Sequence, residues 1–213
     1  MTKRQRSFPS GNYFIVDTET GGRSKECSLL SLYGEVLDRS FTVIDTIDLK
    51  IKPDNGIYHF TAEAMAINKI NIGEHEAVSL TRTQASAKFC SFISKHAISS
   101  KLVTMGHNVR FDVKFAKTHL LPEWDRYFSY RLIDTSSIAQ FLQESGKLDR
   151  NIDCSLDSLI EAYAIKLPEG ERHTAKFDAQ TTLKVYREMV RSLQSLSPTL
   201  TQQQQTNTHG VIA

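Results

Sequence analysis

Short apolar runs and helix-period stripes alternate along most of the chain. The runs are rich in β-branched and aromatic residues, as is typical of strands, and they cover 13–18, 28–38, 41–53, 101–106 and 130–134. Because only a short polar turn at 38–40 separates the second run from the third, we expect these two runs to form a hairpin.

Apolar residues three and four positions apart predict helices that begin near residues 81, 112, 135, 155 and 175. Two of these helices carry start signals. Thr81 with Gln84 three residues later is typical of a capping box, and Ser155 is a suitable N-cap residue. A hairpin followed by alternating helices and strands predicts an α/β fold, with a mixed sheet flanked by helices.

The two ends of the chain differ from this pattern. Residues 1–11 are polar and basic, and we expect a flexible arm there. Residues 192–213 hold no Asp, Glu, Lys or Arg and are rich in Gln, Thr and Ser, which predicts a disordered tail. With 213 residues in all, residues 12–191 are expected to form a single domain.

Composition limits the classes of protein to which the chain can belong. A net charge of +2, from 26 basic and 24 acidic residues, is too balanced to indicate nucleic-acid or membrane binding by itself. No apolar run approaches the roughly 20 residues that a membrane-spanning helix needs, and no signal peptide is evident. Cys27, Cys90 and Cys154 are odd in number and far apart, which favours reduced thiols in a cytoplasmic protein.

Candidate chemistry begins with two acidic residues at the end of the first strand. Asp17 and Glu19 are two positions apart, so both side chains point to the same face of the sheet. Two neighbouring buried carboxylates repel each other and are costly unless solvent or a cation compensates them. Two exposed acids at a strand end account for the pattern equally well.

Three further polar residues stand at helix starts. Asp112 follows a strand and opens a helix, where the helix dipole favours an anion. His173 immediately precedes the last helix, and Asp178 lies in its first turn beside the apolar stripe. Each is explained more simply, when taken alone, as a capping or solvated residue.

In combination these residues form an ordered pattern: Asp-x-Glu on the first strand, an Asp after His-Asn-x-x-Phe, and His-x-x-x-x-Asp at the last helix. From about Tyr13 to Val190 the chain resembles the DEDDh, or DnaQ-like, 3′–5′ exonucleases. The resemblance implies an RNase H-like fold and two divalent ions, Mg²⁺ or Mn²⁺, held by four carboxylates. It also implies that His173 deprotonates the attacking water. The implied metal ligands are Asp17, Glu19, Asp112 and Asp178.

The resemblance further implies a set of substrate-binding residues near the strand end, in the segment 64–70 and shortly before Asp112. These are Thr18, Thr20, Gly21, Asn68, Ile70 and Asn108. Three residues depart from the family pattern nearby: Gly21 lacks a side chain that could shape the pocket, Arg23 replaces a frequent apolar contact, and Lys69 stands where a glycine is usual. Basic residues near the motifs, such as Lys114 and Lys117, could contact phosphates, although solvated helix residues are the simpler interpretation.

We therefore expect a metal-dependent exonuclease that releases nucleoside 5′-monophosphates from the 3′ end of single-stranded or frayed DNA or RNA. The alternative is an accessory proofreading subunit that acts mainly by docking on a polymerase, with the segment after residue 192 as its contact. No membrane association is expected.

Overall fold

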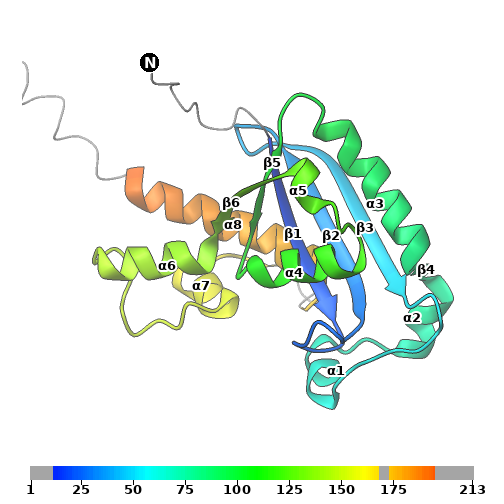
Figure 1. Ribbon diagram of the computed structural model, residues 1–213. Helices are drawn as coiled ribbons and strands as arrows, with labels where there is room; N and C mark the ends of the chain where they lie inside the picture. The colour runs from blue at the N-terminus through cyan, green and yellow to red at the C-terminus, as the bar shows by residue number, and fades with distance from the viewer. Residues whose placement is uncertain (1–11, 168–172, 195–213) are drawn as a thin grey trace, which may run out of the picture.

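The computed structural model describes residues 12–167 and 173–194 of the protein. Within them, one sheet has the strand order β4-β3-β2-β1-β5-β6, with β1 paired antiparallel to β2 and parallel to β5 (Figure 1). The strands are β1 (Tyr13–Thr20), β2 (Leu29–Leu37), β3 (Val43–Lys52), β4 (Leu80–Thr81), β5 (Leu102–Gly106) and β6 (Phe128–Asp134).

Eight helices belong to the described residues. They are α1 (Ala62–Asn68), α2 (Ile72–Val78), α3 (Arg82–His96), α4 (Arg110–His119), α5 (Trp124–Tyr127), α6 (Thr135–Glu144), α7 (Leu156–Ala162) and α8 (Ala175–Gln194). The mixed sheet with helices on its faces confirms the expected α/β class. No helix in this part of the chain is long and apolar enough to cross a membrane.

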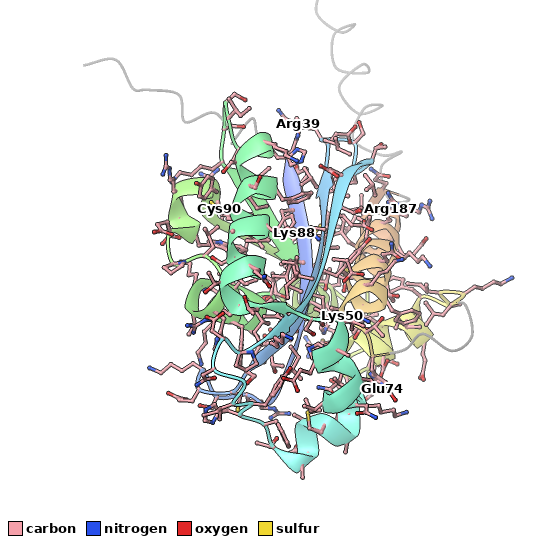
Figure 2. The ribbon with its side chains drawn as sticks, turned by 90° about the vertical axis from the view of Figure 1, so that its right-hand side faces the viewer. Arg39, Lys50, Glu74, Lys88, Cys90 and Arg187 are labelled. Carbon is pink, nitrogen blue, oxygen red and sulfur yellow. The ribbon has the colours of Figure 1, made fainter. Side chains whose placement is uncertain are left out.

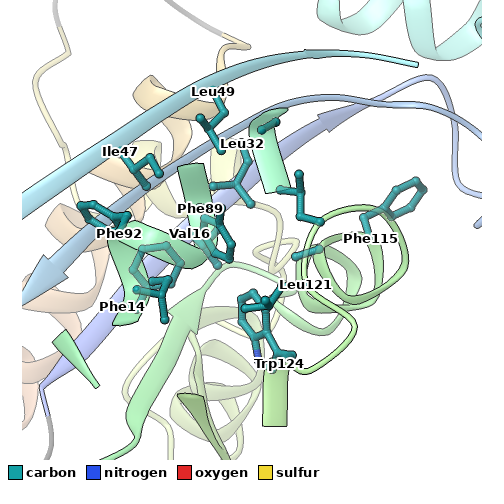
Figure 3. Close-up of a cluster of buried hydrophobic side chains, with 14 of the residues drawn as sticks. Phe14, Val16, Leu32, Ile47, Leu49, Phe89, Phe92, Phe115, Leu121 and Trp124 are labelled. Atoms are coloured by element: carbon teal, nitrogen blue, oxygen red, sulfur yellow. The ribbon is translucent and has the colours of Figure 1, made fainter. Parts of the chain in front are cut away.

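Both faces of the sheet are covered, so β1 lies at the centre of the protein. Figure 2 shows the sheet between α3 and α8. On the α3 face, Phe14 and Val16 pack with Phe89 of α3, Phe115 of α4 and Trp124 of α5 (Figure 3). On the α8 face, Ile15 packs against Leu183, and α6 and α7 add a separate apolar cluster against α8. Burial on alternate sides of β1 therefore fixes its register and its orientation.

Most of the expected elements are present. The hairpin of β2 and β3 is confirmed by their antiparallel register, the capping box at Thr81 has both of its hydrogen bonds, and Ser155 caps α7. Helix α4 begins at Arg110, slightly before the expected start, and its N-cap is Val109. Asn108 does not cap this helix: its backbone has φ 53, and its N–H donates to Asp134 at 2.9 Å.

The sequence pattern did not reveal α1 and α2. Each has only seven residues, so neither presents enough turns for a clear apolar period. Their ends are instead set by side-chain caps, because Thr61 accepts from the N–H of Ala64 and Asn71 accepts from the N–H of Gly73. At the other end of the chain, α8 extends to Gln194, three residues into the segment expected to be a tail. The rest of that segment and the arm at 1–11 lie outside the described residues.

Lys69 occupies the position after α1 that ends the helix. Its φ is 56, in the left-handed region, and its N–H donates to the carbonyl of Met65 at 3.0 Å. A helix end of this kind favours glycine, because a Cβ atom is strained there. At the position where the family pattern has a glycine, this chain thus has an exposed lysine whose backbone adopts a conformation typical of glycine.

Replacing Lys69 by glycine should raise the free energy of unfolding by about 1 kcal/mol, because the strain of a side chain at positive φ is removed. Urea denaturation measures the change. Lys88→Gly, within α3, is the matched control and should lower the stability by about 1 kcal/mol. A loss of stability in Lys69→Gly would show that its backbone is not strained.

Candidate active site

Three carboxylates converge where β1 ends beside the start of α8. One carboxylate oxygen from each of Asp17, Glu19 and Asp178 lies within 4.8 Å of the others. Asp17 and Glu19 extend from the same face of β1, and Asp178 lies in the first turn of α8. The structure therefore brings together residues that are far apart in the sequence.

Packing against β2 holds the first turns of α8 close to the sheet. Ala175 and Ala179 of α8 are buried against Tyr33, and Tyr33 stands opposite Asp17 in the pairing of β1 with β2. Because alanine side chains are small, the helix backbone can approach the strands closely. Asp178 lies between these two alanines in sequence and is thereby placed beside β1.

A buried polar network fixes the same helix. The Tyr33 hydroxyl donates to Glu35 at 2.8 Å, and the Gln180 amide donates to both Glu35 at 2.9 Å and the Tyr33 oxygen at 3.2 Å. Glu35 is only 3% exposed, so a rotation of α8 that broke these bonds would leave a buried group unsatisfied. Sequence reasoning missed these three residues, although a glutamate within an apolar strand is a signal that could have found one of them.

Asp112 approaches the cluster from the first turn of α4. It is 3% exposed, and its Oδ1 accepts a hydrogen bond of 2.7 Å from the Thr18 hydroxyl. Its carboxylate lies outside the group of three that meet within 4.8 Å. It is still close enough for its charge to raise the pKa values of Asp17 and Glu19.

Burial and like charge together make the carboxylates unusually weak acids. Burial is the larger cause, and with the neighbouring carboxylates it raises the pKa of Asp17 well above its usual range and that of Glu19 to about 8. Burial also raises the pKa of Asp112 to about 7, against the opposing hydrogen bond from Thr18. The carboxylate oxygens are hard donors, and their ionisation is unfavourable without a compensating positive charge. Such a cluster fits a divalent cation such as Mg²⁺ or Mn²⁺.

His173 stands beside this cluster, in the turn that leads into α8. It is half-buried, its φ is 64, and it lines a cleft of about 630 Å³ together with Glu19. Asn68 and Ile70 line the same cleft. At its far side the cleft reaches β3 and α2, where Lys50 and Glu74 are labelled in Figure 2.

A second cleft, of about 400 Å³, opens on the other side of the β1 end. Among its lining residues are Thr18, Thr20 and Asn68 from the expected substrate-binding set, together with Ile67 and Phe111. Asn68 connects the two clefts, because its amide donates to the carbonyl of Thr20 at 3.2 Å and its oxygen accepts from the N–H of Ile70 at 3.0 Å. Glu19 also lines both clefts, so each gives access to the carboxylates.

Two of the expected substrate-binding residues line neither of these two clefts. Gly21 packs against the chain, since a Cβ atom there would meet the carbonyl oxygen of His59 at 2.3 Å. Its N–H and carbonyl also hydrogen-bond to Ser28 and Thr61. Glycine is thus needed for the close approach of two segments. Asn108 is exposed and is not among the residues that line either cleft.

The central strand, the flanking helices and the convergence of acidic residues at the strand end define an RNase H-like fold. Among solved structures, the zinc-bound complex of E. coli exonuclease I with single-stranded DNA superposes with a TM-score of 0.68 at 20% identity, covering 87% of this chain and 41% of that chain. Exonuclease I from Methylocaldum szegediense gives a TM-score of 0.68 at 18% identity, with coverages of 87% and 41%. The expected RNase H-like fold is therefore confirmed.

The chain is also similar in sequence to parts of two larger proteins. A DNA polymerase III of the PolC type from Pediococcus pentosaceus is 28% identical over 179 residues, and one from Latilactobacillus sakei is 27% identical over 181 residues. These matches cover 81% and 84% of this chain but only 11% of each relative, so the chain spans about a tenth of their length. No protein-family model matches the chain.

The raised pKa values of the carboxylates predict how the stability of the protein depends on pH when metal is removed with EDTA. Their pKa values are higher in the folded than in the unfolded protein, so their contribution is fully present below about pH 4 and is lost as pH rises through 7 to 8. Glu19→Gln should reduce this loss and stabilise the protein at pH 8 by roughly 2–5 kcal/mol. Thermal unfolding between pH 5 and pH 8.5 measures both effects. Glu144→Gln, at an exposed carboxylate, is the matched control and should leave the profile unchanged.

Proposed function

We propose that the chain is a metal-dependent 3′–5′ exonuclease that hydrolyses phosphodiester bonds at the 3′ end of single-stranded or frayed nucleic acid and releases nucleoside 5′-monophosphates. The observation that carries the proposal is the meeting of Asp17, Glu19 and Asp178 within 4.8 Å, on a fold shared with exonuclease I. The raised pKa values support it, because such a cluster has little value to a protein that never binds a cation there.

Asp17, Glu19, Asp112 and Asp178 are the proposed ligands of two divalent ions, Mg²⁺ or Mn²⁺. When bound, a pair of such ions supplies an activated water and stabilises charge on the leaving oxygen. Thr18 would orient Asp112 through its hydrogen bond to Oδ1, and the network around Tyr33 would keep Asp178 in place. The protein's own part is thus to hold four carboxylates in fixed positions.

His173 is the proposed general base. It lines the same cleft as Glu19, so a ring nitrogen could accept a proton from water held beside the carboxylates. Its place in a turn, rather than within α8, leaves the imidazole free to reorient toward that water.

The second cleft is the proposed site of the terminal nucleoside. Phe111 and Ile67 give it apolar surface for a base, and Thr18, Thr20 and Asn68 give it polar groups near the sugar. Helix α1 forms one side of it through Ala64 and Ile67.

Digestion of 5′-labelled DNA and RNA oligonucleotides of matched sequence tests the proposal. With Mg²⁺ or Mn²⁺, the labelled products should shorten one nucleotide at a time from the 3′ side, and EDTA or Asp17→Asn should abolish the reaction. Substrates with a blocked 3′ hydroxyl should react slowly at the first step. Fragments from a circular single strand, or immediate release of the 5′ label, would overturn the proposal.

His173→Ala should lower the single-turnover rate by about 10²–10⁴-fold, the typical contribution of a general base, while strand binding is unchanged. His96→Ala is the matched control, since His96 contacts Asp45 at 3.0 Å outside both clefts. It should leave the rate per folded molecule unchanged. A His173→Ala rate close to that of the control would remove this residue from the mechanism and leave the carboxylate assignment intact.

The sequence relatives favour a second candidate. Both are DNA polymerase III proteins, and the matching stretch is a small part of each. An accessory proofreading subunit would correspond to the same arrangement divided between two chains: this chain and a separate polymerase on which it docks. Adding a polymerase should then increase removal of mismatched 3′ ends well beyond the rate of the isolated chain, and deletion of residues 195–213 should reverse the increase.

A further inference from the structure

We infer that a groove between α4 and β6 binds the single-stranded segment on the 5′ side of the nucleotide in the active site. The inference rests on the proposed exonuclease function and extends it to the path of the substrate. The groove measures about 470 Å³. Among the residues that line this α4–β6 groove are Arg110, Lys114, Lys117, Ser129, Tyr130 and Leu132.

One wall of the groove is basic. Arg110, Lys114 and Lys117 are four and three positions apart on α4, so their side chains lie along one side of the helix. Arg110 and Lys114 are exposed, and among the described residues no carboxylate lies within ion-pair distance of either. Lys117 pairs with Asp125 at 2.8 Å. A chain with a net charge of only +2 thus concentrates positive charge where a phosphate backbone could follow it.

The opposite wall carries an exposed aromatic ring. Tyr130 is 83% exposed on β6, the strand at the edge of the sheet, and the guanidinium of Arg131 lies 5.6 Å from its ring centroid. An edge strand more often carries charges or proline that discourage pairing with another chain. An aromatic ring next to a basic helix is instead the combination that single-strand-binding proteins use for bases and phosphates.

The groove and the proposed site of the terminal nucleoside both border the start of α4. Phe111 lines the second cleft, and its neighbour Arg110 lines the α4–β6 groove. Asp112 follows on the same turn of α4, beside the carboxylate cluster. With 10 residues, α4 extends about 15 Å away from the active site, far enough to accompany more than the last nucleotide. A strand that ends in the second cleft can therefore pass from Phe111 to Arg110 and along the groove.

The test compares variants of both walls on oligonucleotides from 2 to 12 nucleotides long. The variants are Lys114→Ala and Tyr130→Ala, with Tyr130→Phe to restore the ring. Lys88→Ala on α3 and Phe141→Ala on α6, whose ring is 63% exposed, are matched controls outside the groove. Turnover is measured in the active protein. Affinity is measured by fluorescence anisotropy with Asp17→Asn added to every protein, so that the strand stays intact.

Tyr130→Ala should weaken binding of the longer oligonucleotides at least about 5-fold, as expected for the loss of one stacked base, and Tyr130→Phe should restore it. Lys114→Ala should lower the slope of log affinity against log salt by about 0.7, the value for one phosphate contact on a single strand. Both variants should turn over the dinucleotide like the unaltered protein, because it does not reach the groove. The two control variants should match the unaltered protein at every length.

The inference is wrong if Tyr130→Ala and Lys114→Ala bind long strands as the controls do while the unaltered protein still shortens them. That outcome would leave the exonuclease function standing and assign the groove to another occupant, such as a peptide paired with the β6 edge. If the unaltered protein releases no nucleotide from any oligonucleotide, the proposed function itself fails. The two failures are therefore distinguishable in one set of measurements.

Discussion

The gathering of partly buried, mutually repelling carboxylates at one strand end is the constraint on which the site depends. Asp17 and Glu19 share one face of β1, and Asp178 joins them within 4.8 Å. Burial and mutual repulsion raise the pKa values of Asp17 and Glu19, so the metal-free arrangement becomes less stable as pH rises and the groups lose their protons. The rest of the domain must supply enough stability to hold these groups together, as expected where function conflicts with folding.

The two faces of β1 meet this requirement in different ways. On the α3 face, a large apolar cluster that includes Phe14, Phe89 and Trp124 anchors the strand. On the α8 face, small alanines let the helix approach the strands, and the network of Tyr33, Glu35 and Gln180 fixes its rotation. The apolar side gives stability, whereas the polar side gives the position of Asp178. Rigid elements on both sides of a site are what hold reactive groups to a narrow geometry.

The departures from the family pattern have separate physical meanings. Gly21 is required because a side chain would collide with the His59 carbonyl, so its effect on the second cleft is a consequence of how two segments pack. Lys69 adopts the left-handed conformation in place of a glycine, and its exposed side chain adds a charge beside Asn68, which lines both clefts. Neither residue is among the proposed metal ligands. Neither lines the second cleft, but each is next in sequence to a residue that does.

The sequence alone determined the class of fold and the hairpin of β2 and β3, because both depend on local periodicity. It also determined the helix caps at Thr81 and Ser155, because each cap is a side chain that bonds to a nearby backbone N–H. It also indicated the residues of the candidate site, since their order matched a family pattern. Only the tertiary structure decided that Asp17, Glu19 and Asp178 meet while Asp112 is turned toward Thr18, and that Asn108 lies apart from both clefts. The hydrogen bond between Gln180 and Glu35 likewise joins residues 145 positions apart, and the groove beside α4 depends on how that helix packs beside β6. Contacts of this kind depend on how helices pack across a sheet, and no local pattern of residues encodes that packing.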